Sequence, residues 1–522
     1  MFQRNFAFFP AGFRWAFAAI VAAVAAGCTA VGPNFREPGP QSVPESHPYT
    51  PEPMPAQTTG APGVAGTVQR FASGEDIPAQ WWTLFRSAPL DELIRTALVN
   101  SPTLVAAEAV LRQAQENYNA EYGSKVYPNV GGQLNVARER SVQFGPKPSI
   151  FTLYNASVAV SYTVDAFGGV RRDLEVFGAA IDYQRFQLEA AYLALTANLV
   201  TTAIQEASLR AQIKAIGEVL AAQEKSLELT RKQAALGAIA RSPVLTLGAQ
   251  AAQTRAQLPP LEKALAQTRH QLAVYAGWLP SQVRLPEYEL ESLQIPQDLP
   301  VTLPSALVRQ RPDIRASEAL LHQASAQVGV ATANLYPQIT LSGSAGPAAT
   351  RFSDLFSGTG FLWSIGAGLV QPIFNGGALQ ARRRAAEAAY EQAAAQYQST
   401  VLGAFQNVAN ALRALELDAE TLRAQAEAVA LSRESLDLIT RQFQIGATSY
   451  LNLLDAQRTY QQSRVALALA QAARFADTAA LFQALGGGWW TRRSNGDPAN
   501  GDPANGDPAR ADAASRPVAI KE

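Results

Sequence analysis

The chain contains two copies of one structural unit. Short motifs from the first half recur in the second at an offset of about 209 residues, a period far longer than that of a solenoid repeat. The paired motifs are Ser101-Pro102 with Arg311-Pro312, Tyr127-Pro128 with Tyr336-Pro337, Gly168-Gly169 with Gly376-Gly377, and Gly237 with Gly446. Each copy carries the same order of patterns: a helix, two alternating strands, a very long helix and a shorter helix. We therefore expect a pseudo-symmetric pair of strand-and-long-helix units.

Charge and motif content exclude several classes of function. The 522 residues carry a formal net charge of zero, which gives no electrostatic basis for binding nucleic acid. The three histidines, His47, His270 and His322, are scattered and offer no metal-ligand spacing. No glycine-rich phosphate loop and no nucleophile elbow stands in the sequence. We therefore expect neither an enzyme nor a resident metal or cofactor.

The N-terminus indicates export across a membrane. Arg4 and Arg14 precede an apolar run that ends in small residues at Gly27, followed by Cys28, the only cysteine. This arrangement resembles a bacterial lipoprotein signal, in which residues 1–27 are removed and Cys28 receives a diacylglycerol and an N-acyl chain. An ordinary signal peptide with a chance cysteine, or a short membrane anchor, is the alternative.

Composition divides the rest of the chain. Residues 28–75 are rich in Pro, Gly, Ser and Thr, which predicts an extended tether. The C-terminal residues 489–522 are low in complexity and predict a disordered tail. Between them we expect a first repeat at 76–285, an equatorial linker at 286–303 and a second repeat at 304–488. No segment after Cys28 approaches the ~20 continuous apolar residues of a spanning helix, so only strands of a closed barrel could cross a membrane.

Strand patterns are the sharpest local signal. Apolar and polar residues alternate with a period of two in four segments, at about 129–140, 151–166, 338–346 and 361–373. In the second segment Val158 and Tyr162 share one face, whereas Asn155 and Ser161 share the other. A soluble sandwich with its apolar face inward is one interpretation, but a small, polar opposite face suits a water-filled lumen. Four strands cannot close a barrel, which needs about eight, so this interpretation requires several chains.

Two long stretches without proline, 169–236 and 377–445, predict very long helices. At ~1.5 Å per residue each would form a rod about 100 Å long. Each ends at a glycine, Gly237 or Gly446, which suits the left-handed residue that follows a helix. Shorter returning helices are expected at about 244–276 and 450–485. A soluble antiparallel coiled coil used as a spacer would explain the rods but not the strands.

These features together are similar to the TolC-like outer-membrane efflux family, in its lipidated, NodT-type branch. The resemblance rests on the lipoprotein signal, on Trp81–Phe85, on the duplicated unit and on the segment Gln444–Gln457. It implies a mixed α+β membrane protein: a trimer with one twelve-stranded outer-membrane β-barrel, four strands per chain, continued by a long α-helical periplasmic barrel with an equatorial domain.

The resemblance also implies a function and partners. The protein would be the passive exit duct of a tripartite pump for small toxic compounds or drugs, lipid-anchored in the outer membrane and extending into the periplasm. Its partners would be two further copies, a periplasmic membrane-fusion adaptor, an inner-membrane resistance-nodulation-division transporter and outer-membrane lipid. The alternatives are the duct of a type I protein-secretion system and a non-conducting lipidated helical scaffold.

The resemblance places a periplasmic gate in the second helical tip. Leu451 matches a hydrophobic ring and Asp455 an acidic ring, and Asn452 stands where some members have a second Asp. A ring of carboxylates at a constriction binds cations and can gate by side-chain contacts. Alternatively, Asp455 is a carboxylate that favours the helix dipole.

The tip turns themselves contain Gly237 and Arg241 in the first copy and Gly446 and Thr448 in the second. Pro243 suits the start of a helix. Arg241 could pair with an acidic group on a neighbouring helix. Because Leu451 and Asp455 occur only in the second tip, we expect the two copies to differ most there.

Overall fold

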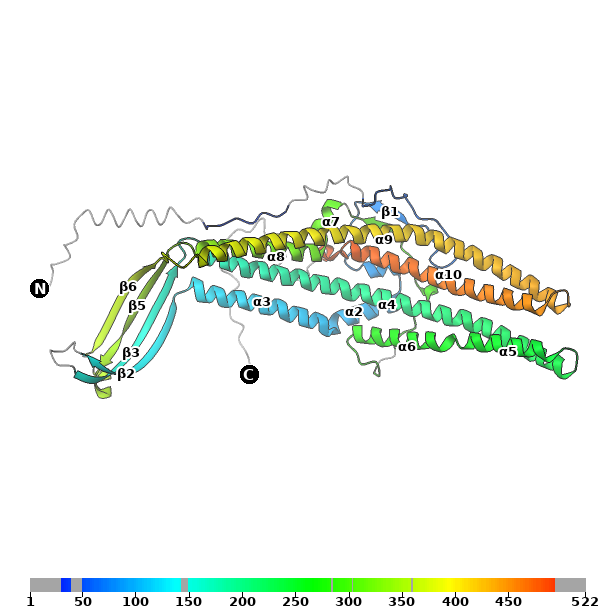
Figure 1. The fold of residues 1–522 in the computed structure, drawn as a ribbon, viewed down its shortest axis with the longest axis horizontal. Coiled ribbons are helices and arrows are strands. Elements are labelled where there is room, and N and C mark those ends of the chain that lie inside the picture. Colours follow the sequence, from blue (N-terminus) through cyan, green and yellow to red (C-terminus); the bar gives the residue numbers. More distant parts are fainter. Residues whose placement is uncertain are drawn as a thin grey trace.

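The computed structural model describes residues 30–38, 49–141, 149–282, 285–302, 304–357 and 360–492. Cys28, the expected signal peptide and the tail beyond Arg492 lie outside the described residues. The molecule is elongated: the long strands lie at one end, and the turns of the helical hairpins lie at the other (Figure 1). The rods α4 and α9 run most of the distance between these ends.

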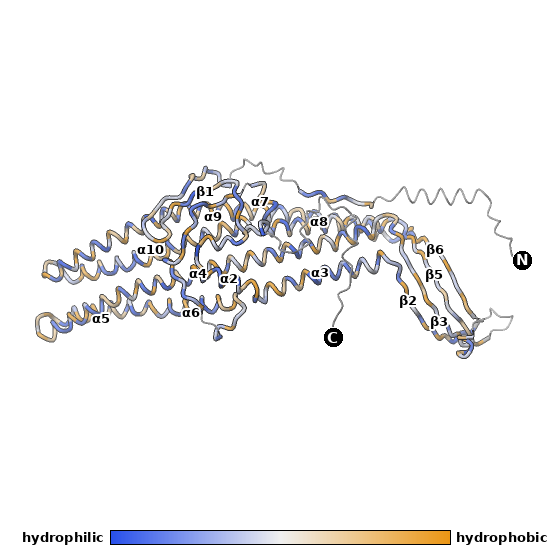
Figure 2. The backbone as a smooth tube through the Cα atoms, turned by 180° about the vertical axis from the view of Figure 1, so that it is seen from behind, coloured by the Kyte–Doolittle hydropathy of each residue, from blue (hydrophilic) through white to orange (hydrophobic). Residues whose placement is uncertain are grey.

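The two rods have equal length. Helix α4 spans Gly169–Ala235 and α9 spans Ala378–Gln444, 67 residues each. Both begin after a glycine in the left-handed conformation, Gly168 or Gly377, and neither contains proline. Hydrophobic and hydrophilic residues alternate along the helices rather than forming one apolar run (Figure 2). The shorter helices α3 (Pro102–Val126) and α8 (Pro312–Ala333) lead from the middle of the molecule towards the strands.

The returning helices differ between the copies. In the second copy α10 is one helix, Tyr450–Ala484. In the first copy the expected single helix at 244–276 is wrong: α5 (Arg241–Arg255) and α6 (Leu258–Tyr275) are separate. Two adjacent prolines at the start of α6, Pro259 and Pro260, lack the N–H that would continue the helical ladder. The residues at the equivalent positions of α10, Ala468 and Leu469, carry that N–H.

The four long strands form one antiparallel sheet in the order β2-β3-β5-β6. Their bounds are Asn129–Ser141, Ser149–Val164, Gln338–Ala349 and Phe361–Val370. A short helix, η4 (Phe352–Phe356), lies between β5 and β6. The pairing of β3 with β5 joins the two hairpins, so segments far apart in the sequence share one sheet. Within the described residues, strands β2 and β6 are the edge strands of this sheet.

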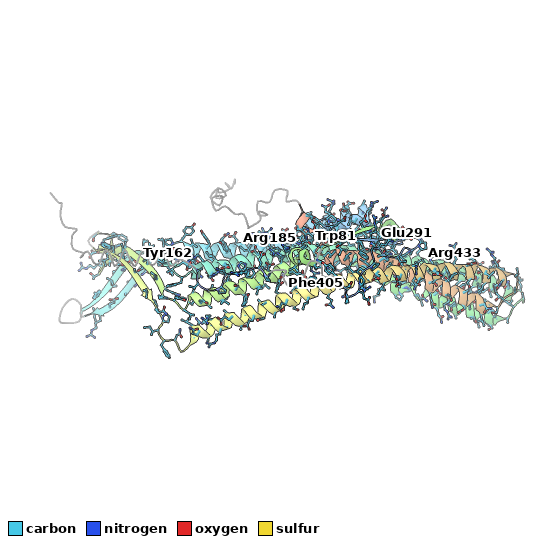
Figure 3. The ribbon with its side chains drawn as sticks, turned by 90° about the horizontal axis from the view of Figure 1, so that it is seen from above. Trp81, Tyr162, Arg185, Glu291, Phe405 and Arg433 are labelled. Carbon is cyan, nitrogen blue, oxygen red and sulfur yellow. The ribbon has the colours of Figure 1, made fainter. Side chains whose placement is uncertain are left out.

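A belt of short elements surrounds the rods near their middle (Figure 1). Its members are β1 (Arg70–Ser73), η2 (Trp81–Phe85), α2 (Ala88–Asn100), η3 (Leu290–Ser292), β4 (Asp298–Val301), α7 (Pro304–Gln310) and η5 (Trp489–Thr491). Strands β1 and β4 pair in parallel, which joins the segment before the first repeat to the linker between the repeats. Figure 3 shows Trp81 at the belt, with Tyr162 towards the strands and Arg433 towards the helical tips.

The largest apolar cluster lies inside this belt. Trp81 and Phe85 are fully buried against α10, with ring centroids 5.5 Å from Phe482 and 6.2 Å from Phe475 respectively. Each buried aromatic side chain removes about 150–250 Å² from water, so these rings dominate the packing. The aromatic motif near the start of the first repeat therefore fixes the belt to the rods.

Two expectations at the ends of the fold are wrong. Residues 28–75 do not all form a tether, because Thr58 and Gln69 are buried and Gln69 Oε1 accepts a 2.6 Å hydrogen bond from Arg474 Nη2 in α10. The tail does not begin at residue 489, because Trp489 Nε1 donates to the Gln310 carbonyl oxygen at 2.6 Å. Gln69 and Trp489 are each held by a partner distant in the sequence, 405 and 179 residues away, rather than by a local pattern.

One helix of the described chain, α10, is long and apolar enough by length and composition to cross a membrane. Half of its most apolar stretch is buried, and its neighbours are α9 and α4. This burial is that of a core helix, in keeping with an alanine-rich sequence that lets helices approach closely.

Candidate functional site

The helical tips are two turns of the same geometry. Gly237 and Gly446 have φ angles of +73° and +74°, and each follows the end of a rod. In the first tip the Ala238 N–H donates to the Gln233 carbonyl at 2.9 Å, and in the second the Ala447 N–H donates to the Gln442 carbonyl at 2.8 Å. These are the bonds of a Schellman cap, which satisfies the last carbonyls of a helix.

The second tip presents an apolar side chain to solvent. Leu451 lies in the first turn of α10 and is 68% exposed. Beside it, Asn452 Nδ2 donates to Thr448 Oγ1 at 2.9 Å, and the Asn452 N–H donates to Ser449 Oγ at 3.4 Å. Thr448 and Ser449 thus hold Asn452 at the start of the helix, whereas Leu451 is left largely uncovered by the described residues of the chain.

Asp455 lies beyond the first turn of α10, and that first turn contains no acidic residue. This position weakens the interpretation of Asp455 as a partner of the helix dipole, an effect confined to the first turn. Arg458 Nη2 instead donates to Asp455 Oδ1 at 2.6 Å, and both side chains are more than half exposed. Sequence reasoning missed Arg458, although its spacing of three residues on a helix was a usable signal.

Tyr450 anchors the same tip from the inside. Its ring lies 6.0 Å from Phe443 of α9, and burial raises the pKa of its hydroxyl. Arg241 of the first tip is exposed, and the described residues of the single chain include no ion-pair partner for it. The first tip also contains no acidic residue from Gly237 to Arg255.

At the opposite end the sheet separates polar from apolar residues across all four strands. Directly paired residues share a face, so each row of the sheet can be followed from β2 to β6. One row runs Val130, Val160, Gly343 and Ile365, and its neighbour runs Asn129, Ser161, Ser342 and Gly366. The apolar face also carries Leu134, Tyr154, Val158, Tyr162, Leu341, Trp363 and Leu369. Trp363 is 71% exposed and Ile365 is 83% exposed, so the part of the chain that the structure describes leaves these side chains of the apolar face uncovered.

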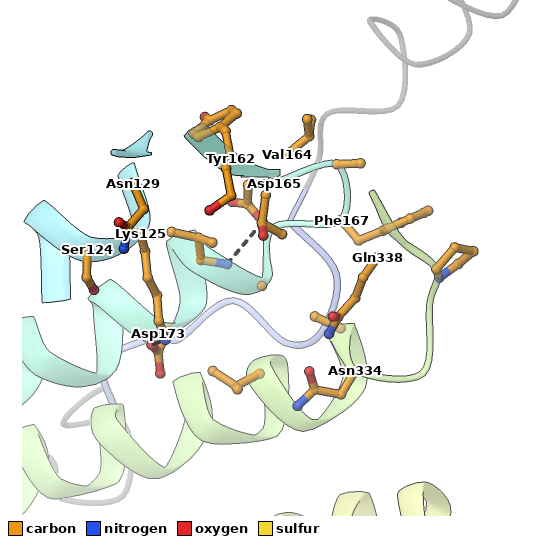
Figure 4. Close-up of a pocket in the computed structure, with 18 of the residues that line it drawn as sticks. Ser124, Lys125, Asn129, Tyr162, Val164, Asp165, Phe167, Asp173, Asn334 and Gln338 are labelled. Atoms are coloured by element: carbon orange, nitrogen blue, oxygen red, sulfur yellow. Dashed lines mark hydrogen bonds and ion pairs between the residues drawn. The ribbon is translucent and has the colours of Figure 1, made fainter. Parts of the chain in front are cut away.

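A cavity of about 450 Å³, lined by both polar and apolar residues, lies where the strands meet the helices (Figure 4). Lys125 of α3 and Asp173 of α4 line this cavity and form an ion pair. Lys125 forms a second ion pair with Glu121, one turn earlier on α3. Asp165, just after β3, accepts hydrogen bonds from the N–H groups of Val170 and Arg171 at 3.0 and 3.1 Å. Its carboxylate therefore caps α4 and fixes the angle between strand and rod.

A pair of half-buried carboxyl groups lies beside the belt. Asp477 of α10 lies near Asp418 of α9, and burial together with the neighbouring Asp418 carboxyl raises the pKa of the Asp477 carboxyl. Arg474, one turn earlier, opposes the shift and is itself fully buried. Two adjacent carboxyl groups share a proton more readily than they both ionise. The sequence offered no signal for this pair, because the two residues lie on different helices.

A profile of the outer membrane efflux protein family matches residues 93–278 and 303–487, one match in each repeat. The chain belongs to the outer membrane efflux protein family. It is an outer-membrane channel protein of efflux pumps and not an enzyme. The long rods, the strands and the two repeats are the arrangement of this family.

Relatives of this efflux protein cover most of its length. It is 31% identical over 442 residues to the pyoverdine export outer membrane protein OpmQ of Pseudomonas putida, covering 83% of this chain and 93% of that protein. It is 31% identical over 412 residues to nodulation protein T of Rhizobium leguminosarum, covering 76% and 82%. It is 28% identical over 421 residues to the cation efflux system protein CusC of Escherichia coli, covering 79% and 88%.

Solved channels have the same fold. The outer-membrane channel OprN superposes with a TM-score of 0.77 at 28% identity, covering 88% of this chain and 99% of that one. The outer membrane protein VceC of Vibrio cholerae superposes with a TM-score of 0.72 at 26% identity, covering 79% and 99%. The expected family and the expected channel function are therefore confirmed.

Proposed function

We propose that three copies of this protein form the exit duct of a tripartite efflux pump. Their sheets would join into one twelve-stranded barrel in the outer membrane, and their rods would form a tube across the periplasm. The observation that carries this proposal is the four-stranded sheet, whose apolar face is exposed along its whole width. A face of this kind is stable only against lipid or other apolar surface.

The edges of the sheet support closure between copies. Among the residues that the structure describes, strands β2 and β6 each have one side without a strand partner. Backbone groups on a free edge cannot be left unpaired in the hydrocarbon of a bilayer. Pairing of β6 with β2 of the next copy would remove both edges, and three sheets would exceed the roughly eight strands that a barrel needs. The polar face, which includes Ser344 and Ser364, would then line the lumen.

The partners and cargo follow from the same assembly. A passive duct has no energy source of its own, so the proposal requires an inner-membrane transporter, here of the resistance-nodulation-division class, and a periplasmic adaptor that joins it to the helical tips. Related proteins are named for the export of pyoverdine, toluene, antibiotics and cations. We propose small toxic compounds as the cargo. These names favour a pump component over a type I protein-secretion duct.

The gate would lie at the second tip. Three copies of Leu451 would form an apolar ring and three copies of Asp455 an acidic ring one turn away. The exposed leucine and the accessible carboxylate support this placement. Arg458 would partly neutralise the acidic ring, so the aspartate would hold the tips together by hydrogen bonds as well as by charge. Asn452 would keep the first turn of α10 rigid.

Lipidation of Cys28 would attach each copy to the membrane. Metabolic labelling with palmitate tests this attachment, because the label should be lost when Cys28 is replaced with serine. Label that persists in the Cys28→Ser protein, or that is absent from both proteins, would refute the lipid anchor.

Conductance in planar bilayers tests the duct and its gate together. We expect a small current from the wild-type trimer and a larger one from the double variant Leu451→Ala, Asp455→Ala. The matched control is Leu245→Ala, which removes an exposed leucine from the first tip. If a trimer of the double variant carries no current, the proposal of a duct is refuted and a non-conducting scaffold is favoured. An equal increase in current from Leu245→Ala would refute the placement of the gate at the second tip.

A further inference from the structure

Ala30 and Val31, which follow the expected lipid site Cys28, pack where β3 ends and α4 begins. This end of the sheet is hereafter called the foot of the sheet. The Val31 N–H donates to the Phe167 carbonyl at 3.1 Å, just beyond the end of β3. Ala30 lies against Gly168, where an added Cβ would stand 2.4 Å from the Ala30 Cα. Gly168 is also the left-handed cap of α4. The segment Ala30–Phe35, hereafter the strap, therefore packs directly on the junction between strand and rod.

A buried arginine holds the strap. Arg172 in the first turn of α4 is only 4% exposed. Its guanidinium donates to the Val31 carbonyl at 3.2 Å and to Asn34 Oδ1 at 2.5 Å, and Gly32 O lies at 3.5 Å. Glu175 Oε2, at 2.7 Å, is its partner on the same helix. A buried cation needs its donors satisfied, and here most of the acceptors belong to the strap.

The far end of the strap is held by α8. The Phe35 ring stacks on the His322 imidazole, with centroids 4.3 Å apart and planes 14° from parallel. His322 Nε2 lies 2.8 Å from Glu175 Oε1, so Glu175 links the imidazole to Arg172. Phe35 also packs on an apolar cluster that includes Leu321 of α8 and Tyr397 of α9. The strap thus contacts both repeats.

Two glycines leave room for these contacts. A Cβ on Gly329 of α8 would lie 2.8 Å from the Arg172 Cδ, and a Cβ on Gly32 would lie 2.6 Å from the Gly329 Cα. Both distances are shorter than carbon atoms tolerate. Any side chain at Gly329 would therefore displace either the arginine or the strap.

Arg172 and Glu175 of α4 and His322 and Gly329 of α8 form this site, hereafter the notch. The equivalent helices, α9 and α3, lack these residues. At the same offset, Ala381 and Arg384 of α9 stand where α4 has Arg172 and Glu175. In α3, aligned with α8 by the prolines that begin them, Arg112 and Asn119 stand where α8 has His322 and Gly329. Duplication alone would have produced two such notches, so the one that exists serves the single N-terminus.

We propose that this notch is a docking site for the strap, that it fixes the lipid anchor at the foot of the sheet, and that Arg172 is its positioning residue. The positioning role rests on the lipidation of Cys28 proposed above. Only Thr29 stands between Cys28 and Ala30 in the sequence. Because a chain spans at most about 3.6 Å per residue, the two residue steps place the anchor point within roughly 7 Å of Ala30. The lipid would then enter the leaflet at the level where β3 ends, and it would orient the monomer before the barrel closes.

Hydrogen exchange of the purified, lipidated trimer tests this docking. We expect the peptide that contains Val31 to exchange at least tenfold faster in Arg172→Gln than in the wild type. Arg382→Gln is the matched control, because Arg382 is an exposed arginine in the equivalent turn of α9. Phe35→Ala gives the same readout from the strap itself if Arg172→Gln does not assemble.

The outcomes separate this inference from the proposed function. An unprotected strap in the wild type, or equal protection in Arg172→Gln, Phe35→Ala and the wild type, would overturn the docking site while palmitate still labels Cys28. Loss of protection in the Arg172 and Phe35 variants alone, with labelling retained in every protein, would support it. A protected strap in a protein without Cys28-dependent palmitate would overturn the role in anchor positioning.

Discussion

Replacement of glycine with alanine should have opposite effects on stability at a helical tip and inside a rod. Gly446 adopts a φ of +74°, and an added Cβ would meet nothing within 4 Å, so the cost of Gly446→Ala is conformational rather than steric. A left-handed non-glycine residue costs about 1–2 kcal/mol. Gly403 lies inside α9, where an added Cβ also meets nothing within 4 Å. There alanine should stabilise the helix by about 0.5–1 kcal/mol.

Hydrogen exchange at the tip measures both effects locally. The Ala447 N–H that closes the cap should exchange about 5- to 30-fold faster in Gly446→Ala, since each 1.4 kcal/mol is a factor of ten. Gly237→Ala should do the same to Ala238, because the first tip has the same geometry. Gly403→Ala should slow exchange in the middle of α9. Unchanged exchange at the tips, or faster exchange in all three variants, would contradict the assignment of the glycines as left-handed caps.

Three further changes probe the sheet, the belt and the acid pair. Ile365→Lys should lower the yield of membrane-inserted trimer, because a lysine facing lipid costs about 2–4 kcal/mol. Ser364→Lys, on the opposite face of the sheet, should insert normally. Equal yields of the two variants would show that the faces are misassigned. Phe475→Ala should destabilise the belt by about 3–5 kcal/mol, seen as a lower thermal midpoint in detergent, and an unchanged midpoint would refute the belt as the main core. Asp477 has its pKa raised from 3.8 to about 8, so its protonated form stabilises the fold below about pH 4 and this contribution is lost as the pH rises through 8. Asp477→Asn should flatten the decline of the thermal midpoint between pH 5 and 9, and an equally steep decline in that variant would exclude this carboxyl as its source.

Much of the fold follows from local patterns. Period-two alternation indicates the strands, and the absence of proline together with Gly237 and Gly446 indicates where the rods end. The break between α5 and α6 was visible in Pro259 and Pro260, whose missing N–H groups outweigh the helical composition around them.

Other features depend on contacts that no local pattern encodes. The segment around Gln69 has the composition of a linker, yet it is buried because Arg474, about 400 residues later, bonds to it. The Asp477–Asp418 pair and the Arg172 notch arise in the same way, where separate helices meet. At the tips, the sequence identified Leu451 and Asp455 as candidates but not Arg458, which forms an ion pair with the Asp455 carboxylate.

The equal rods have a mechanical consequence. The main apolar cluster contacts α4 only up to Ala211 and α9 only up to Leu422, so beyond these points each helical hairpin is a cantilever. Its free arm is roughly 22–24 residues, or about 35 Å at 1.5 Å per residue, and a tilt of about 10° at the support would sweep its end by about 6 Å. A lever of this kind converts a small rearrangement of belt side chains into a displacement as large as a leucine side chain. Because both arms have nearly the same length, a common tilt would move the two turns of each copy by nearly the same distance.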